Sequence, residues 1–173
     1  PACRRGRVED KPVAICRLKR VAADLKDDFE TQVPKRTNLN GKKVACVGAG
    51  PASLTVANDL LPLGYEVVVF EQHGKPGGLM RTNIPAFRLP ESVMMEEIDV
   101  IARMGAEIRL GAPIASLRAL LHPEIEKGFD AVFIGAGAPK GKELDLPGRA
   151  GSPNIHIGIT WLESVAFGHL DKI

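Results

Sequence analysis

The residues of this chain best suited to chemistry form a glycine turn, Gly48-Ala49-Gly50, directly after an apolar segment. Glycines let a backbone turn sharply, so that its N–H groups can approach a phosphate at the start of the next helix. Counting from Gly48 gives G-x-G-x-x-S, with Ser53 where the dinucleotide fingerprint has a third glycine for helix-to-strand packing. The pattern predicts a pyrophosphate site, and an ordinary strand-to-helix turn is the alternative.

An acid and a second glycine pair follow this turn. Glu71 ends an apolar run at the spacing of about 20 residues at which a carboxylate can accept hydrogen bonds from ribose hydroxyls and repel a 2′-phosphate. Gly77-Gly78 comes within one loop of it. An NAD-only domain has no need of this pair, which would let the backbone pass close to the far side of a longer cofactor. The sequence therefore favours FAD over NAD, with a plain Pro-Gly-Gly turn as the structural alternative.

A third glycine-rich segment, Gly135-Ala136-Gly137, follows the apolar run Ala131–Ile134. It is a second place where the backbone leaves a strand without bulky side chains. A further cofactor contact and a purely structural turn both fit this pattern.

These segments need a scaffold of alternating strands and helices. Strands joined by helical crossovers predict an α/β fold with a mostly parallel sheet, whose ligand lies at the carboxyl ends of the strands. We expect strands at Lys43–Val47, Glu66–Phe70, Glu107–Leu110 and Ala131–Ile134, and helices at Pro12–Asp28, Glu91–Met104 and Leu117–Leu121. A T-x-x-E capping box from Thr160 to Glu163 predicts a final helix that stops near Gly168.

Composition divides the chain into a basic arm and a longer domain. Residues 1–43 hold 12 Lys or Arg against 6 Asp or Glu, whereas the remainder holds 11 against 15. A polar stretch at 34–43 predicts a boundary, with an arm over 1–37 and an α/β domain over 38–173. Because the arm lacks interleaved aromatics and any nucleic-acid module, we expect a solvated surface or a docking face for a partner subunit.

No apolar run reaches the roughly 18 residues of a membrane span and no signal-peptide pattern opens the chain, which favours a cytoplasmic protein without a membrane partner. The first residue, Pro1, suggests a piece of a longer protein. The chain holds three cysteines, no C-x-x-C and only single histidines, so no complete metal site is predicted. Cys16 and Cys46 are expected to be small buried hydrophobes.

The motifs together resemble a known family. G-A-G-P-A-S, F-E, G-G-L and the I-P-A-F-R-L-P of Ile84–Pro90 are similar to the FAD domain of the bacterial glutamate synthase small subunit and to the related domain of dihydropyrimidine dehydrogenase. The match runs over nearly the whole chain. It implies a Rossmann-like FAD-binding fold, preceded by the end of an α-helical iron–sulfur domain and followed, beyond this chain, by a nicotinamide domain and a strand that completes the flavin site.

The resemblance also implies roles for individual residues. It assigns the FAD pyrophosphate to Gly48, Ala49, Gly50, Pro51 and Ala52, the ribose to Glu71, other contacts to Gln72, Gly78, Leu79 and Arg88, and backbone near the adenine to Ile114. Gly135-Ala136-Gly137 is similar to the family's Ala-Thr-Gly turn, without its threonine hydroxyl. Cys3 matches the last cysteine of a cluster motif, but a four-iron cluster ordinarily takes four cysteines.

The implied activity is electron transfer between a nicotinamide nucleotide, FAD and an iron–sulfur or partner-subunit acceptor, with NADPH and a 4Fe–4S cluster expected only in the full-length protein. No catalytic acid, base or nucleophile is assigned, since the flavin carries out such chemistry and the protein positions it. A simple NAD-binding module and a non-catalytic docking domain are the alternatives.

Overall fold

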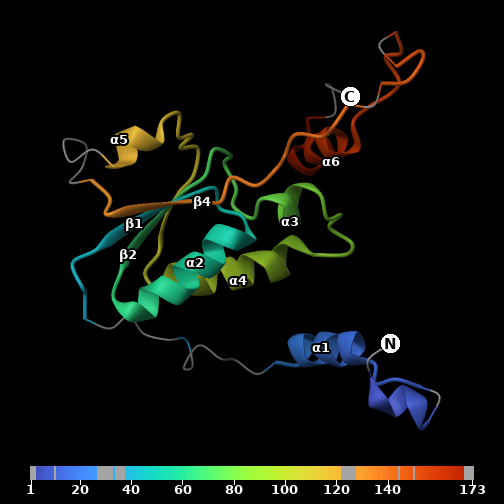
Figure 1. Ribbon diagram of the computed structural model, residues 1–173, viewed down its shortest axis with the longest axis horizontal. Coiled ribbons are helices and arrows are strands. Elements are labelled where there is room, and N and C mark those ends of the chain that lie inside the picture. Colours follow the sequence, from blue (N-terminus) through green and yellow to red (C-terminus); the bar gives the residue numbers. More distant parts are fainter. Residues whose placement is uncertain are drawn as a thin grey trace. The chain divides into compact units, whose positions relative to one another are not determined.

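The computed structural model describes residues 3–9, 11–26, 33, 38–121, 128–143, 145–149 and 151–169. The chain divides into two compact units, Pro1–Val33 and Pro34–Ile173, and each is considered by itself (Figure 1). The predicted boundary between residues 37 and 38 falls beside residues 34–37, which lie outside this description.

In its described residues, the N-terminal unit contains the 3₁₀ turn η1 (Arg4–Arg7) and the helix α1 (Ile15–Asp24). The helix is shorter than predicted, because it begins three residues after Pro12 and leaves helical geometry at Leu25; residues 27 and 28 lie outside the described part. Cys16 is exposed, so its predicted burial is wrong. The reason is that neither element of this unit contains a buried residue, and the apolar stripe of α1 faces solvent.

The larger unit is built on a four-stranded parallel sheet of β1 (Lys43–Val47), β2 (Glu66–Phe70), β3 (Glu107–Arg109) and β4 (Ala131–Ile134). The strand order is β3-β2-β1-β4, which confirms the predicted α/β fold. Strand β3 ends one residue before the predicted Leu110. Because the order reverses at β1, the ends of β1 and β4 lie side by side, with Val47 in register with Ile134. Such a switch point is where parallel sheets bind ligands.

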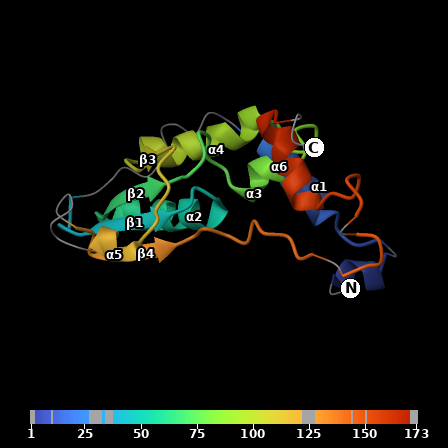
Figure 2. The ribbon, with the colours of Figure 1, turned by 90° about the horizontal axis from the view of Figure 1, so that it is seen from above.

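Helices cover both faces of the sheet. Those of this unit are α2 (Pro51–Leu60), η3 (Leu61–Leu63), α3 (Leu79–Thr82), α4 (Glu91–Arg103), α5 (Leu117–Leu121) and α6 (Gly158–Phe167). Figures 1 and 2 show α2 and α4 on one face and α5 on the other. Leu54 of α2 packs with Met94 and Ile98 of α4, while Phe70 and Phe129 pack edge to face on the α5 side. Cys46 is buried in β1, as predicted.

The start of α6 differs from the prediction. Its N-cap is Ile157, which makes no side-chain cap hydrogen bond, and its first helical residue is Gly158, so Thr160 lies inside the first turn and is not the N-cap. The predicted capping box is therefore wrong, whereas the helix does end at Gly168, which has the left-handed φ of 72°. Among the helices described, none is long and apolar enough to cross a membrane.

Candidate functional site

The first glycine turn sits at the switch point of the sheet. The N–H of Gly48 donates to the carbonyl oxygen of Phe70 at 2.7 Å, and its φ of 92° is one that side chains disfavour. A Cβ at Gly48 would lie 2.6 Å from the carbonyl oxygen of Gly135, so glycine allows the ends of β1 and β4 to meet. Helix α2 starts directly after Gly50, and the N–H groups of its first turn have no partner within the helix. This end of α2 favours an anion.

The second glycine pair packs against the first turn. The N–H of Gly77 donates to the carbonyl oxygen of Ala49 at 2.9 Å. Gly78 has a φ of 53°, and a Cβ on it would lie 2.9 Å from the Cα of Gly50. The close approach that requires Gly78 is thus one between two protein backbones, whereas a Cβ at Gly77 would lie 2.7 Å from the Met94 sulfur. The proximity of the pair to a long cofactor stays a prediction.

The third glycine segment makes room for Ser53. A Cβ at Gly135 would lie 2.1 Å from the Ser53 hydroxyl oxygen, and Ser53 is completely buried. Within the described ranges, this hydroxyl has no hydrogen-bond partner. A serine at the third fingerprint position therefore fits because position 135, on the facing turn, is a glycine.

Glu71 is held at the end of β2 by two backbone groups. It is only 5% exposed, and its two oxygens accept hydrogen bonds from the N–H of Ala49 at 2.8 Å and of His73 at 2.9 Å. A carboxylate offers about four lone-pair sites, so both oxygens can still accept a hydroxyl donor. The acid is thus fixed in position with acceptor capacity left.

A cavity of about 620 Å³ joins these segments. Its size is within the range of roughly 300–1,000 Å³ that is usual for small-molecule sites. The cavity brings together most of the predicted cofactor residues, namely Gly48, Gly50, Pro51, Ala52, Glu71, Gln72, Gly78, Leu79, Ile114, Gly135, Ala136 and Gly137.

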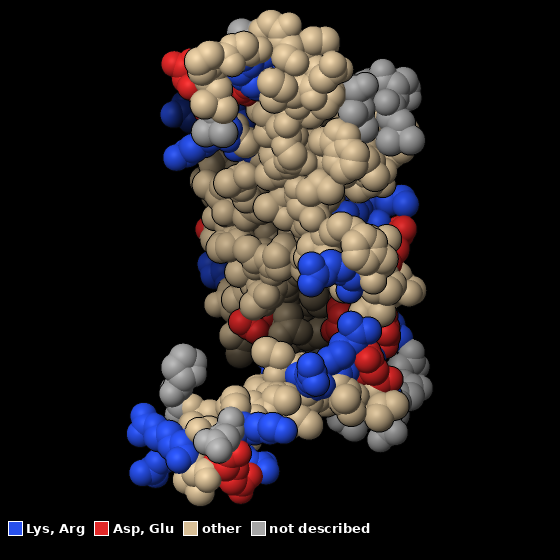
Figure 3. Space-filling view, turned by 90° about the vertical axis from the view of Figure 1, so that its right-hand side faces the viewer, with Lys and Arg blue, Asp and Glu red and all other residues tan. Residues whose placement is uncertain are grey.

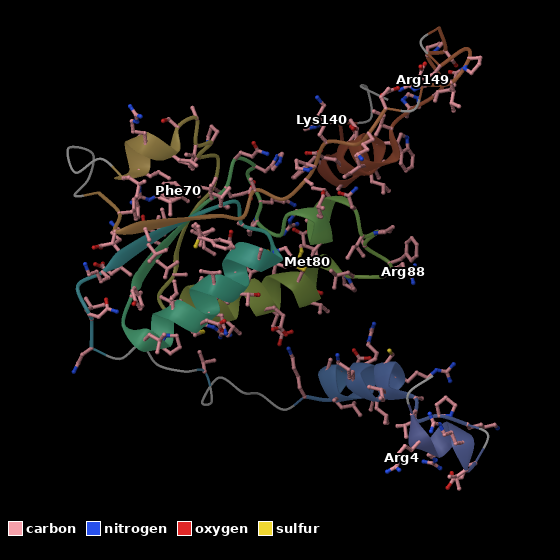
Figure 4. All side chains as sticks on the ribbon, in the orientation of Figure 1. Arg4, Phe70, Met80, Arg88, Lys140 and Arg149 are labelled. Carbon is pink, nitrogen blue, oxygen red and sulfur yellow. The ribbon has the colours of Figure 1, made fainter. Side chains whose placement is uncertain are left out.

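Two predicted cofactor residues are not part of the cavity wall. Ala49 is fully buried and contributes through the backbone bonds to Glu71 and Gly77. Arg88 is exposed, and Figure 4 shows it at the tip of the loop between α3 and α4. Its predicted pairing with a phosphate is not supported by this arrangement and stays a prediction.

Cys3 belongs to the N-terminal unit, whose described residues include several Lys and Arg side chains, drawn in blue in Figure 3. Backbone hydrogen bonds, first that of Val13 and then those of Arg5 and Gly6, lower the pKa of its thiol. No group of three or more His, Cys, Asp or Glu that could hold a metal is found in the described part of the chain. A cluster role for Cys3 therefore stays a prediction.

Several cavity residues escaped the sequence analysis. Thr82, Ala112 and Pro113 line the cavity, as do His73 and Glu163. The His73 ring stacks on Phe167 of α6 at 5.1 Å, and its Nε2 lies 3.6 Å from a Glu163 oxygen. Helix α6 therefore forms a wall of the cavity. These contacts join residues about 90 positions apart, so no local motif indicates them.

Comparison with known proteins agrees with this geometry. Residues 46–100 match the family model of the NAD(P)-binding Rossmann-like domain. The chain is 35% identical to the NAD-dependent dihydropyrimidine dehydrogenase subunit PreT homolog of Salmonella typhi over 93% of its own length. It is 33% identical to the NADP(+)-dependent formate dehydrogenase subunit beta of Moorella thermoacetica over 85%, and 30% identical to the NADH glutamate synthase of Schizosaccharomyces pombe over 99%.

Over most of its own length the chain is therefore similar to parts of several oxidoreductase proteins, and residues 46–100 match the NAD(P)-binding Rossmann-like model. That confirms the resemblance to the glutamate synthase and dihydropyrimidine dehydrogenase proteins inferred from the motifs. The chain spans 39%, 24% and 8% of the lengths of these three relatives, respectively. It therefore matches a part of each, and what each complete protein does is not a property of this domain alone.

Proposed function

We propose that this domain is the FAD-binding portion of an NAD(P)H-dependent oxidoreductase that passes electrons between a nicotinamide nucleotide, the flavin and an iron–sulfur or partner-subunit acceptor. The observation that carries the proposal is the meeting of three glycine-rich segments, around Gly48, Gly78 and Gly135, along one cavity at the switch point. A cofactor with a central pyrophosphate and a group at each end could contact all three of these segments.

The residues present fit FAD. The first turn of α2 offers N–H groups to the pyrophosphate, and Gly48 and Gly50, which lack side chains, line the cavity at this point. Glu71 would accept the ribose hydroxyls, the backbone of Ile114 would lie near the adenine, and Gln72 would make a further contact. The cavity wall also includes Thr82 and Glu163, and we place the flavin end of the cofactor beside them.

A bound flavin supplies hydride and electron transfer, and the chain's own residues bind and orient it. Glu71 fixes the ribose end, and the turn of Gly48–Gly50 holds the phosphates. In the full-length protein we expect NADPH, a partner subunit or electron acceptor, a 4Fe–4S cluster with Cys3 as one possible ligand, and a cytoplasmic location.

The second candidate is binding of a nicotinamide nucleotide in this same cavity. It is favoured by the family model, whose description is NAD(P)-binding. The Glu71 carboxylate argues against a 2′-phosphate and so against NADP here, but it suits NAD as well as FAD. A docking domain without a cofactor is the third candidate, and it would bind neither.

Calorimetric titration of paired variants tests the ribose assignment. Glu71→Arg removes the acceptor at the carboxyl end of β2, whereas Glu66→Arg makes the same charge change at the exposed start of that strand. We expect FAD binding to be lost in Glu71→Arg and kept in Glu66→Arg. Unchanged FAD affinity in Glu71→Arg would refute the ribose role.

A further inference from the structure

Arg81, in α3, carries a charge that is almost completely buried. Its side chain is only 7% exposed. Its Nε donates to the carbonyl oxygen of Pro76 at 2.5 Å, its Nη1 donates to the Glu91 carboxylate at 2.6 Å, and its Nη2 lies 3.2 Å from the sulfur of Met95. A buried charge is unfavourable unless it is paired, and the fixed planar fork of arginine suits three partners in different directions. Arg81 therefore links Pro76, Glu91 and Met95, and we call this set of contacts the Arg81 clamp.

The clamp acts on the loop that forms one wall of the cavity. Pro76 is buried and directly precedes Gly77, whose N–H bonds to Ala49 in the phosphate turn. On the other side, Glu91 is the first residue of α4. Arg81 thus ties the Pro-Gly-Gly loop to α4 while the loop's own backbone contacts the turn that faces the cofactor.

We infer that Arg81 is a positioning residue of the cofactor site, which fixes the backbone of Pro76–Gly78 through the Pro76 carbonyl and Glu91. It does not itself line the cavity, so it acts through Gly78, Leu79 and Thr82, which do. The identity of the ligand rests on the proposed function, whereas the hydrogen bonds by which Arg81 fixes the loop are present without ligand.

Lys75 provides a matched control for charge. Its Nζ lies 3.2 Å from the same Glu91 oxygen that Arg81 contacts, yet its side chain is 54% exposed and it lines no part of the cavity. Exposed pairs of this kind contribute little. If only the ion pair with Glu91 mattered, replacing Arg81 or Lys75 should affect the loop equally. If the hydrogen bond from Arg81 to the Pro76 carbonyl holds the loop, only replacement of Arg81 should affect it.

The test compares Arg81→Met, Arg81→Lys and Lys75→Met in the chain by amide hydrogen exchange without ligand and by FAD titration. In Arg81→Met we expect exchange at the Gly77 amide to rise about tenfold with β1 unchanged, and the FAD dissociation constant to rise about tenfold, or ~1.4 kcal/mol. Arg81→Lys should recover part of both losses, because one ammonium cannot reach both acceptors in the geometry of the fork. Lys75→Met should change the Gly77 exchange rate and the FAD dissociation constant by less than about twofold.

Unchanged Gly77 exchange in Arg81→Met, or equal effects in Lys75→Met, would overturn the inference. If Arg81→Met also loses protection from exchange in β1, the milder variants Arg81→Lys and Glu91→Gln test the inference instead. Both should raise the exchange rate of the Gly77 amide while β1 stays protected. No rise in either variant would refute the role of Arg81 in holding the loop. If the unaltered chain ignores FAD, the proposed function fails, while the exchange measurements still decide whether Arg81 holds the loop.

Discussion

The contact between Ser53 and Gly135 makes a quantitative prediction about the packing under the site. In Gly135→Ala the new Cβ would lie 2.1 Å from the Ser53 hydroxyl oxygen, against ordinary contacts of 3.4 Å or more. The overlap exceeds ~1 Å, and the completely buried serine has no solvent-facing route of escape. Overpacking of a filled interior destabilises by about 1–3 kcal/mol, so we expect Gly135→Ala to lower the free energy of unfolding by that amount.

Removing the hydroxyl should reverse the effect. Ser53→Ala deletes a buried oxygen that has no hydrogen-bond partner in the described segments, and alanine is the better helix former inside α2. We expect this variant alone to be stabilised by about 1 kcal/mol. The Ser53 Cβ lies 3.4 Å from the added carbon, which is an ordinary contact. A contact of 3.1 Å with the Phe133 ring remains, so the double variant should recover part of the loss, with a coupling energy of about 1–2 kcal/mol.

Urea unfolding of the four proteins, followed by circular dichroism, measures this double-mutant cycle. Gly151→Ala is the control, because a Cβ there would meet nothing within 4 Å. Its midpoint should remain close to that of the unaltered chain. Additivity of Ser53→Ala and Gly135→Ala to within ~0.5 kcal/mol would refute the proposed packing.

Two further predictions concern the turn and the far end of the sheet. Gly48→Ala should lower the free energy of unfolding by more than ~2 kcal/mol and abolish FAD binding, because it combines a φ of 92° with a 2.6 Å contact to the Gly135 carbonyl; urea unfolding and calorimetry check this. Asp130 accepts hydrogen bonds from the Lys42 ammonium and the Lys43 N–H, which lower its pKa. Since the folded pKa lies below the unfolded value of about 3.9, this stabilisation is complete above that value and is lost as pH falls through the folded pKa. The urea midpoint of unfolding should therefore fall less between ~pH 6 and ~pH 3 in Asp130→Asn than in the unaltered chain. An unaltered pH dependence would contradict this role of Asp130.

The scaffold could be predicted from sequence because its signals are local. Each strand is a short apolar run between polar or glycine-rich residues, and the turn at Gly48 needs an unusual φ that only glycine adopts easily. These signals located all four strands, their parallel arrangement and most of the cavity wall.

The remaining features depend on long-range packing. Cys16 lies on an apolar stripe, but periodicity does not reveal whether another element covers that stripe. The T-x-x-E pattern at Thr160 is also compatible with a helix that has already begun, as it has at Gly158. Glu163 reaches the cavity only because α6 packs beside α3, and no spacing along the chain encodes that contact.

We propose that the cavity lined by Gly48, Gly78 and Gly135 binds FAD. Titration of the purified chain with FAD, in the presence and absence of excess NADPH, tests it most directly. We expect saturable binding of one FAD per chain, and we expect that NADPH does not displace it. Tight binding of NADPH with no binding of FAD would contradict it.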